Sequence, residues 1–174
     1  MNPTQSSPAA VASLPQLALQ IAVSQLGVSE KPVGSNSGPE VDEYLASVGL
    51  KPGYAWCQSF VHWCYEQAAK QLGVQNPVIK TAGVQDCWNK TAIQFKVSKH
   101  DAILHSSLLL KPGDQFMLSY GHGAGHTGIV EKIEGLVIHT IEGNSNNNGS
   151  REGYEVVRHQ RSLGSPYLLG FIKY

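Results

Sequence analysis

The feature that most constrains the fold is a pair of apolar segments that meet at a tight turn. HTGIVEKI begins at His126 and LVIHTIEG ends at Gly143, with Glu134-Gly135 as the turn between two strands. Runs rich in Val and Ile that flank such a turn predict adjacent antiparallel strands. Other apolar runs bounded by Gly, Asn and Asp extend this sheet, so strands are expected at about residues 115–120, 127–133, 136–142, 153–159 and 167–173.

The N-terminal half carries apolar residues at helical spacing instead. Helices are expected at about residues 14–26, 41–48 and 57–72, each followed by a glycine, with a weaker pattern over 81–90. Helices first and strands second predict an α+β fold, with N-terminal helices packed on one C-terminal antiparallel sheet. We expect residues 1–13, rich in Ser, Pro and Ala, to form a flexible lead-in and residues 14–174 to form a single domain.

Charge and hydropathy exclude several classes of protein. The chain has 13 basic and 13 acidic residues and no basic run, so neither a nucleic-acid partner nor a membrane-surface role is expected. No apolar run approaches the roughly 18 residues that a membrane span needs. The first residues lack the basic and apolar regions of a secretory signal, so the export route stays open. The chain is expected to act as a monomer.

Cys57 stands where a predicted helix begins, directly after Trp56. A helix start offers unpaired backbone N–H groups and about half a positive charge, and both stabilise a thiolate. Cys64 lies two turns further along the apolar face and is expected to pack as a small hydrophobic side chain, while Cys87 has no comparable electrostatic support. On one helix Cys57 and Cys64 would lie about 10 Å apart, beyond disulfide reach. Position alone leaves a structural role for Cys57 open.

A thiol nucleophile needs a base, and the chain has seven histidines. His126 stands where the loop GHGAGHTG enters an apolar strand, which gives its side chain a rigid support. His122 lies in the looser part of the same loop, and a loop histidine is also often an ordinary surface residue. The others are predicted to be less suitable: His62 on the solvated face of its helix, His100 and His105 in a polar connection, His139 pointing away from Glu142, and His159 at a strand end.

Glu142 supplies a third polar group. If Glu134-Gly135 is the turn, His126 and Glu142 are almost symmetric about it, so their side chains are expected to be neighbours on adjacent strands. The carboxylate could then accept the imidazole N–H and fix its tautomer. Asn144, in IEGNSN, could give further polar support. A plain strand-end carboxylate and a plain turn residue are the alternatives for these two positions.

These segments together resemble the CHAP amidohydrolase/peptidase family, within the NlpC/P60-like group of papain-type cysteine hydrolases. The matching stretches are GPEVDEYLASVGLKPGYAWCQSFVHW, KPGDQFML followed by GHTGIVEKI, IEGNSN, and LLGFIKY, so the resemblance covers nearly the whole domain. It implies a papain-like fold and a thiol hydrolase that cleaves amide bonds of bacterial peptidoglycan. Such an enzyme is an N-acetylmuramoyl-L-alanine amidase or a peptidoglycan endopeptidase, and it acts in the cell wall, in the periplasm or outside the cell.

The resemblance also implies roles for particular residues. The catalytic positions are Cys57 as nucleophile, His126 as base, Glu142 as the residue that orients the imidazole, and Asn144 as an auxiliary polar group. Separately from the resemblance, the residues expected to contact substrate are Tyr54, Trp56, Gln58 and His122. Some family members bind calcium through an Asp-rich loop before the cysteine, but KPGYAW has no carboxylate, so no metal and no cofactor is expected.

Three alternatives compete with this interpretation. A zinc hydrolase is disfavoured because the chain has no C-x-x-C or H-E-x-x-H spacing. A non-catalytic peptidoglycan-binding module would keep the fold without turnover. A cysteine amidase or peptidase acting on another amide, such as a protein or a small metabolite, would keep the chemistry and change the substrate. The sequence leaves open which peptidoglycan bond is cut and whether the role is housekeeping, phage or toxin.

Overall fold

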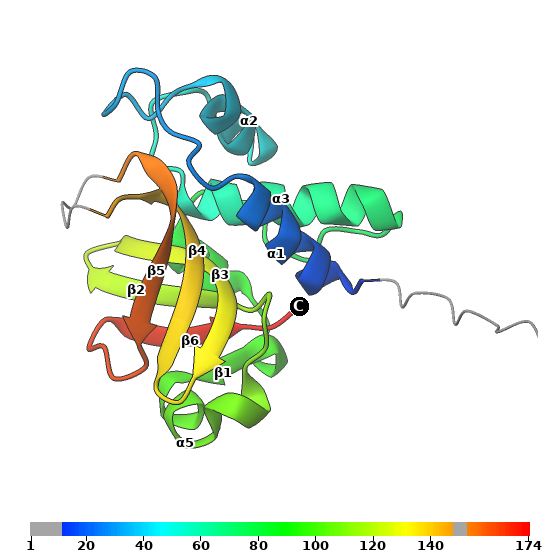
Figure 1. Ribbon diagram of the computed structural model, residues 1–174, viewed down its shortest axis with the longest axis vertical. Helices are drawn as coiled ribbons and strands as arrows, with labels where there is room; N and C mark the ends of the chain where they lie inside the picture. Colours follow the sequence, from blue (N-terminus) through cyan, green and yellow to red (C-terminus); the bar gives the residue numbers. More distant parts are fainter. Residues whose placement is uncertain (1–11, 148–152) are drawn as a thin grey trace, which may run out of the picture.

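The computed structural model describes residues 12–147 and 153–174, and this part of the chain forms five α-helices and a six-stranded antiparallel sheet (Figure 1). The expected α+β fold is therefore confirmed. Residues 1–11 of the predicted lead-in lie outside the described part. The helices are α1 (Leu14–Ser24), α2 (Pro39–Ser47), α3 (Cys57–Leu72), α4 (Val84–Lys90) and α5 (Lys99–Leu109), with a 3-10 turn at Ile93–Phe95.

The strands form one sheet in the order β1-β6-β2-β3-β4-β5. Their bounds are β1 (Lys96–Ser98), β2 (Gln115–Gly121), β3 (Ala124–Glu134), β4 (Val137–Ser145), β5 (Glu155–Ser162) and β6 (Leu168–Ile172). The central strands β2, β3 and β4 follow one another in the chain, so the hairpin predicted from the sequence lies at the middle of the sheet. Within the described residues no helix is both long and apolar enough to cross a bilayer.

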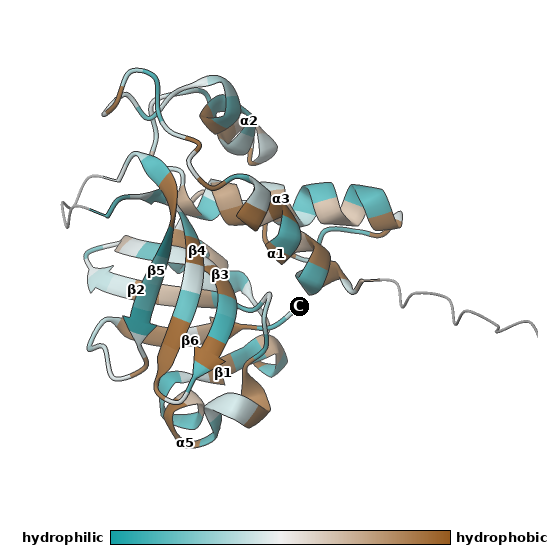
Figure 2. Ribbon diagram, viewed as in Figure 1, coloured by the Kyte–Doolittle hydropathy of each residue, from teal (hydrophilic) through white to brown (hydrophobic). Residues whose placement is uncertain are grey.

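Three hydrophobic clusters pack the helices against the sheet, and the smallest joins Val84 and Cys87 of α4 to Met117 and Ile172. Figure 1 shows α1 and α3 lying together at one end of the sheet and α5 at the other, and Figure 2 shows hydrophobic residues on α1, α3, β3 and β4. The first cluster packs Trp56, Phe60 and Cys64 against Ile129 and Ile141 of the sheet. The second joins α5 to the sheet around fully buried aromatic residues, Phe116 and Phe171.

The helix boundaries agree with the sequence at α3 and differ elsewhere. α3 begins at Cys57 and ends before Gly73, which adopts the left-handed conformation (φ 66°) that glycine accepts without strain. The polar connection predicted around His100 and His105 is wrong, because this segment forms α5. The apolar spacing there is irregular since the helix is kinked at His105 (φ −138°, ψ 36°), and no regular stripe marks it in the sequence.

Two further predictions need correction. The hairpin turn is Gly135-Leu136 rather than Glu134-Gly135, because Glu134 still pairs with Val137. His62 was expected to be solvated, but it is 4% exposed and its Nδ1 lies 3.0 Å from the hydroxyl of Ser47 on α2. Packing of α2 against α3 covers the helix face that the apolar stripe alone leaves open.

The start of α3 approaches β4 very closely at Gly143. A Cβ atom at this position would lie 2.6 Å from the Trp56 ring and 2.7 Å from the Phe60 ring. Glycine is therefore required for these two aromatic side chains to pack directly on the strand. This close packing fixes the N-terminal end of α3 beside the end of β4 that carries Glu142.

We predict that Gly143→Ala destabilises the protein by about 1–3 kcal/mol, because the added methyl overpacks the contact with Trp56 and Phe60. Gly164→Ala is the matched control, since Gly164 is exposed and its nearest neighbour is the flexible Ser162 hydroxyl. Urea unfolding of both variants measures the effect. Equal stability of the two variants would contradict the proposed close contact.

Candidate active site

Cys57 is the first residue of α3, and the residue before it is firmly anchored. Trp56 is fully buried, and its indole Nε1 donates to Glu30 Oε1 over 2.9 Å. Glu30 also accepts the backbone N–H of Gly34 at 2.7 Å, which holds the carboxylate in place. Trp56, the residue before α3, makes no side-chain capping bond, so among the described residues it leaves the first backbone N–H groups of the helix free of its side chain, beside the Cys57 thiol.

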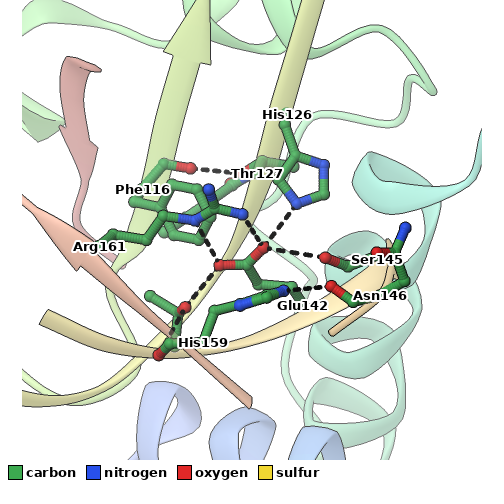
Figure 3. A network of polar contacts seen from close by, with 10 residues as sticks. Phe116, His126, Thr127, Glu142, Ser145, Asn146, His159 and Arg161 are labelled. Carbon is green, nitrogen blue, oxygen red and sulfur yellow. Dashed lines mark hydrogen bonds and ion pairs between the residues drawn. The ribbon is translucent and has the colours of Figure 1, made fainter. Parts of the chain in front are cut away.

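His126 on β3 and Glu142 on β4 are brought together by the central hairpin. The imidazole Nε2 lies 2.7 Å from Glu142 Oε2, which confirms the proximity predicted from the sequence (Figure 3). Ile129 pairs with Ile141, so the ladder continues with Gly128 beside Glu142, and His126 lies two residues further along the same face. A Cβ at Gly128 would be 2.9 Å from Glu142 Cγ. Glu142 therefore uses the space left by Gly128 to reach His126.

Glu142 has no exposed surface and is surrounded by donors. Arg161 on β5 donates from Nε to Oε1 at 2.8 Å and from Nη2 to Oε2 at 2.5 Å. The Thr140 hydroxyl donates to Oε1 at 2.6 Å, and the Ser145 hydroxyl lies 3.4 Å from Oε2. Burial alone would raise the pKa of Glu142, but the hydrogen bonds from Arg161 and His126 hold that pKa well below its ordinary value. The carboxylate is therefore ionised.

The imidazole of His126 lies between this carboxylate and the thiol of Cys57. Burial favours the neutral ring, but the polar interactions with Cys57 and Glu142 outweigh it and raise the pKa of His126 to about 9. At neutral pH the site therefore favours the protonated ring, so the imidazole can hold a proton taken from the Cys57 thiol. Thiol, imidazole and carboxylate come from α3, β3 and β4, and α3 packs directly against both strands.

The other two cysteines are placed for packing. All three cysteines lie in the described part of the chain, and none of them forms a disulfide. Cys64 and Cys87 are fully buried. Burial raises the pKa of Cys64 well above its ordinary value and the pKa of Cys87 to about 11. Both are neutral thiols in the interior, as expected for Cys64.

A groove of about 940 Å³ opens over Cys57 and His126. Its volume is within the range of small-molecule and cofactor sites. The described residues that line it are mostly aromatic, polar or glycine: Ala55, Cys57, Tyr120, Gly121, His122, Ala124, Gly125, His126, Asn144, Ser145, Asn146, Gly153, His159, Arg161 and Tyr167. The rings of Tyr120 and Tyr167 meet edge to face with centroids 5.2 Å apart, and both side chains are about half exposed.

Two residues predicted to assist the site lie in this groove. Asn144 adopts a left-handed conformation (φ 53°), which Asn accepts more readily than most residues, and it lies among the residues that line the groove. Its side-chain Oδ1 is buried and, among the described residues, has no hydrogen-bond partner. His122 lines the groove from the tight β2–β3 connection. Their roles stay predictions.

The expected substrate contacts of Trp56 and Gln58 need correction, because both side chains are fully buried. Trp56 is held by Glu30, as described above. The Gln58 Oε1 accepts from Gln115 Nε2 at 2.7 Å, inside the protein. Tyr54 is 55% exposed but is not among the residues that line the groove, so its contact with substrate stays a prediction.

Sequence reasoning missed Arg161, which completes the carboxylate cluster. The predicted strand stopped near residue 159, whereas β5 continues to Ser162. Thr140 pairs with His159, so Arg161 lies two residues further along β5 on the face that also carries Glu142. A predicted strand that extended to residue 161 would have placed the Arg161 guanidinium on this face. The signal was absent because RHQRS is polar and carries no apolar alternation.

The described residues form no candidate metal site. Within 12–147 and 153–174 there is no group of three His, Cys, Asp or Glu side chains placed to hold an ion. The sequence-based expectation that the site works without a metal or a cofactor stays a prediction.

Comparison with known proteins gives one family match. A family model described as CHAP domain matches residues 49–144, which is more than half of the chain and includes Cys57, His126 and Glu142. No curated protein matched. Among solved structures, "The crystal structure of Ly7917" is similar with a TM-score of 0.44 and 18% identity, over 93% of this chain and 62% of that chain. The chain thus spans less than two thirds of that structure's length.

We predict that the His126 imidazole titrates near pH 9 rather than near its ordinary value of 6.5. Glu142→Gln should lower this midpoint, because a neutral amide stabilises the imidazolium less than a carboxylate does. NMR titration of the ring resonances measures both midpoints. Glu134→Gln is the matched control, since Glu134 lies 2.7 Å from His139 on the surface. A wild-type midpoint at or below 6.5 would refute this account of the site.

Proposed function

Because this chain belongs to the CHAP domain family, we propose that it is a cysteine hydrolase that cleaves amide bonds of bacterial peptidoglycan. The family is one of amidases and peptidases of the peptidoglycan-hydrolase type. The observation that carries the finer proposal is the alignment of three side chains at one groove. Cys57 reaches the groove, His126 lies beside it, and the buried carboxylate of Glu142 holds the imidazole at 2.7 Å.

The first chemical step uses the thiol and the imidazole as a pair. His126 takes the proton of Cys57, and the sulfur attacks the carbonyl carbon of the substrate amide. The raised pKa of His126, about 9, lets the ring keep this proton as an imidazolium at neutral pH. Glu142 stabilises the positive ring and fixes the nitrogen that faces the thiol.

The backbone N–H groups at the start of α3 stabilise the tetrahedral intermediate. The negative oxygen of the tetrahedral intermediate needs donors, and the backbone N–H groups at the start of α3, that of Cys57 included, lie beside the attacking sulfur. One such donor is typically worth about 3 kcal/mol to the transition state. His126 then gives its proton to the leaving amine as the C–N bond breaks, and water hydrolyses the thioester to a carboxylic acid and free thiol.

The groove suits an extended polar substrate. Its described lining combines the Tyr120–Tyr167 pair with the polar side chains of Asn144, Ser145 and His159. The carboxylate of Glu142 lies behind this surface with no exposed area. We expect His122 and Asn144 to contact the substrate, because both line the groove at the open end of the β3–β4 hairpin.

We expect residues 14–174 to work as a single catalytic domain, and the monomer expected from the sequence stays a prediction. The substrate places the enzyme at the cell wall, in the periplasm or outside the cell.

We predict that Cys57→Ala lowers the release of soluble fragments from purified sacculi by about 10⁴-fold or more, because a nucleophile that acts with its base as one unit is lost. Cys64→Ala is the matched control: it removes a fully buried thiol from the same helix, two turns away. That variant should lose stability but keep its activity once folded. Equal activity of Cys57→Ala and wild type would end the proposal.

Mass spectrometry of the digested sacculi identifies the bond that is cut. A free amine on L-alanine together with an intact, peptide-free muramic acid identifies an amidase. New termini inside the stem or the cross-bridge identify an endopeptidase. Binding to sacculi with neither product would indicate a non-catalytic module, and cleavage of other amides alone would assign the chemistry to a different substrate.

A further inference from the structure

Arg161 makes a two-point contact with the carboxylate that holds the proposed base. Its Nε donates to Glu142 Oε1 at 2.8 Å, and its Nη2 donates to Oε2 at 2.5 Å. A guanidinium fork on a carboxylate fixes the plane of the carboxylate as well as its charge. Figure 3 shows Glu142 between Arg161 on one side and His126 on the other.

The surroundings of Arg161 hold its guanidinium in this position. Its side chain is 29% exposed, and the guanidinium carbon lies 5.8 Å from the centroid of the fully buried Phe116 ring. The same ring lies 6.1 Å from the His126 imidazole. Phe116 therefore supports both partners of Glu142, and rotation of the carboxylate away from His126 would break both bonds from Arg161.

We propose that Arg161 is a positioning residue: it holds the Glu142 carboxylate ionised and directed at His126, and it thereby orients the imidazole toward Cys57. This inference rests on the proposed function. Arg161 thus joins Cys57, His126 and Glu142 as a fourth residue of the site. It acts through Glu142 and makes no contact with the reacting atoms.

Arg161 also lines the groove, so direct contact with the substrate is the competing explanation. The two explanations differ in what they require of Glu142. A positioning role disappears when Glu142 can no longer act, whereas a substrate contact persists without it. A positioning role lowers kcat, whereas a lost ground-state contact raises KM.

The chain supplies a matched control on the same strand. Arg158 makes an equivalent two-point contact with Glu131, with Nε at 2.8 Å and Nη2 at 2.8 Å from the carboxylate oxygens. Its side chain is 54% exposed and is not among the groove-lining residues. Arg158→Met therefore removes an arginine–glutamate pair from β5 without touching the site.

The experiment compares Arg161→Met, Arg158→Met, Glu142→Gln and the double variant Arg161→Met/Glu142→Gln in the full chain. kcat and KM are measured on soluble peptidoglycan fragments between pH 4 and pH 10. The rate of Cys57 alkylation by iodoacetamide is measured over the same range. Arg161→Lys is included because it keeps the charge and loses the fork, and circular dichroism establishes which variants fold.

We expect Arg161→Met to lower kcat by roughly 10- to 100-fold, the range typical when a supporting partner of a site residue is removed, with KM changed less than about twofold. In the Glu142→Gln background the same substitution should have no further effect. Arg158→Met should match wild type. Arg161→Lys should recover part of the rate.

The pH dependence of kcat and of alkylation separates a positioning role from a purely structural role, because only a positioning role changes it. The titratable or charged groups facing the Glu142 cluster are His126 on β3, Cys57 on α3, Tyr120 on β2, and Arg161 and His159 on β5. Without Arg161 the pKa of Glu142 rises, so the carboxylate takes up a proton at higher pH. Any loss of kcat and of alkylation rate that follows protonation of Glu142 should therefore begin at higher pH in Arg161→Met than in wild type, with Arg161→Lys in between.

Several results would overturn the proposal. An equal loss of kcat in the Glu142→Gln background, or a raised KM with unchanged kcat, would each do so. If Arg161→Met does not fold, Arg161→Lys carries the test, and wild-type kcat in that variant contradicts the need for the fork. Alkylation separates this inference from the proposed function: a Glu142-dependent shift in a protein that cleaves no peptidoglycan overturns the function alone.

Discussion

A carboxylate without exposed surface must find its hydrogen bonds inside the protein, and Glu142 obtains them from β3, β4 and β5. An isolated buried charge would be strongly destabilising, so the surrounding donors are a condition for this fold as well as for the site. The central hairpin brings the imidazole, and β5 brings the guanidinium. The sheet order β3-β4-β5 is therefore what permits an ionised side chain at this depth.

The absence of side chains at two glycines sets the spacing of the site. Gly128 leaves the volume through which Glu142 reaches His126, and Gly143 lets Trp56 and Phe60 pack on β4. Gly128 thus sets the distance between the Glu142 and His126 side chains, and Gly143 sets how closely α3 approaches the sheet. Packed interiors deform little, so these contacts transmit a fixed geometry to the thiol at the start of α3.

Much of this arrangement can be predicted from the sequence because it is local. The hairpin makes His126 and Glu142 close in space, but the turn alone does not put them on one face. Pairing next to the turn would set Glu142 opposite Ile129, and the register shift between Val130 and Lys132 moves it opposite Gly128, on the face that carries His126. The start of α3 at Cys57 is similarly local. Long-range packing escaped the sequence argument: the burial of His62 depends on α2, and the direction of Arg161 depends on how far β5 continues. Helix α5 escaped because its kink breaks the periodicity.

A second polar cluster lies in the interior next to the residues that follow Cys57 and His126, and it explains why Gln58 is buried. Gln115 on β2 donates to Gln58 Oε1 at 2.7 Å and to Thr127 Oγ1 at 2.8 Å, while its Oε1 accepts from the Tyr174 hydroxyl at 2.6 Å. Gln58 and Thr127 directly follow Cys57 and His126 in the chain. One amide thus ties together the two backbones that carry the proposed nucleophile and base. With both N–H groups and the carbonyl engaged, that amide cannot rotate without breaking at least one bond, so it resists separation of α3 from β3.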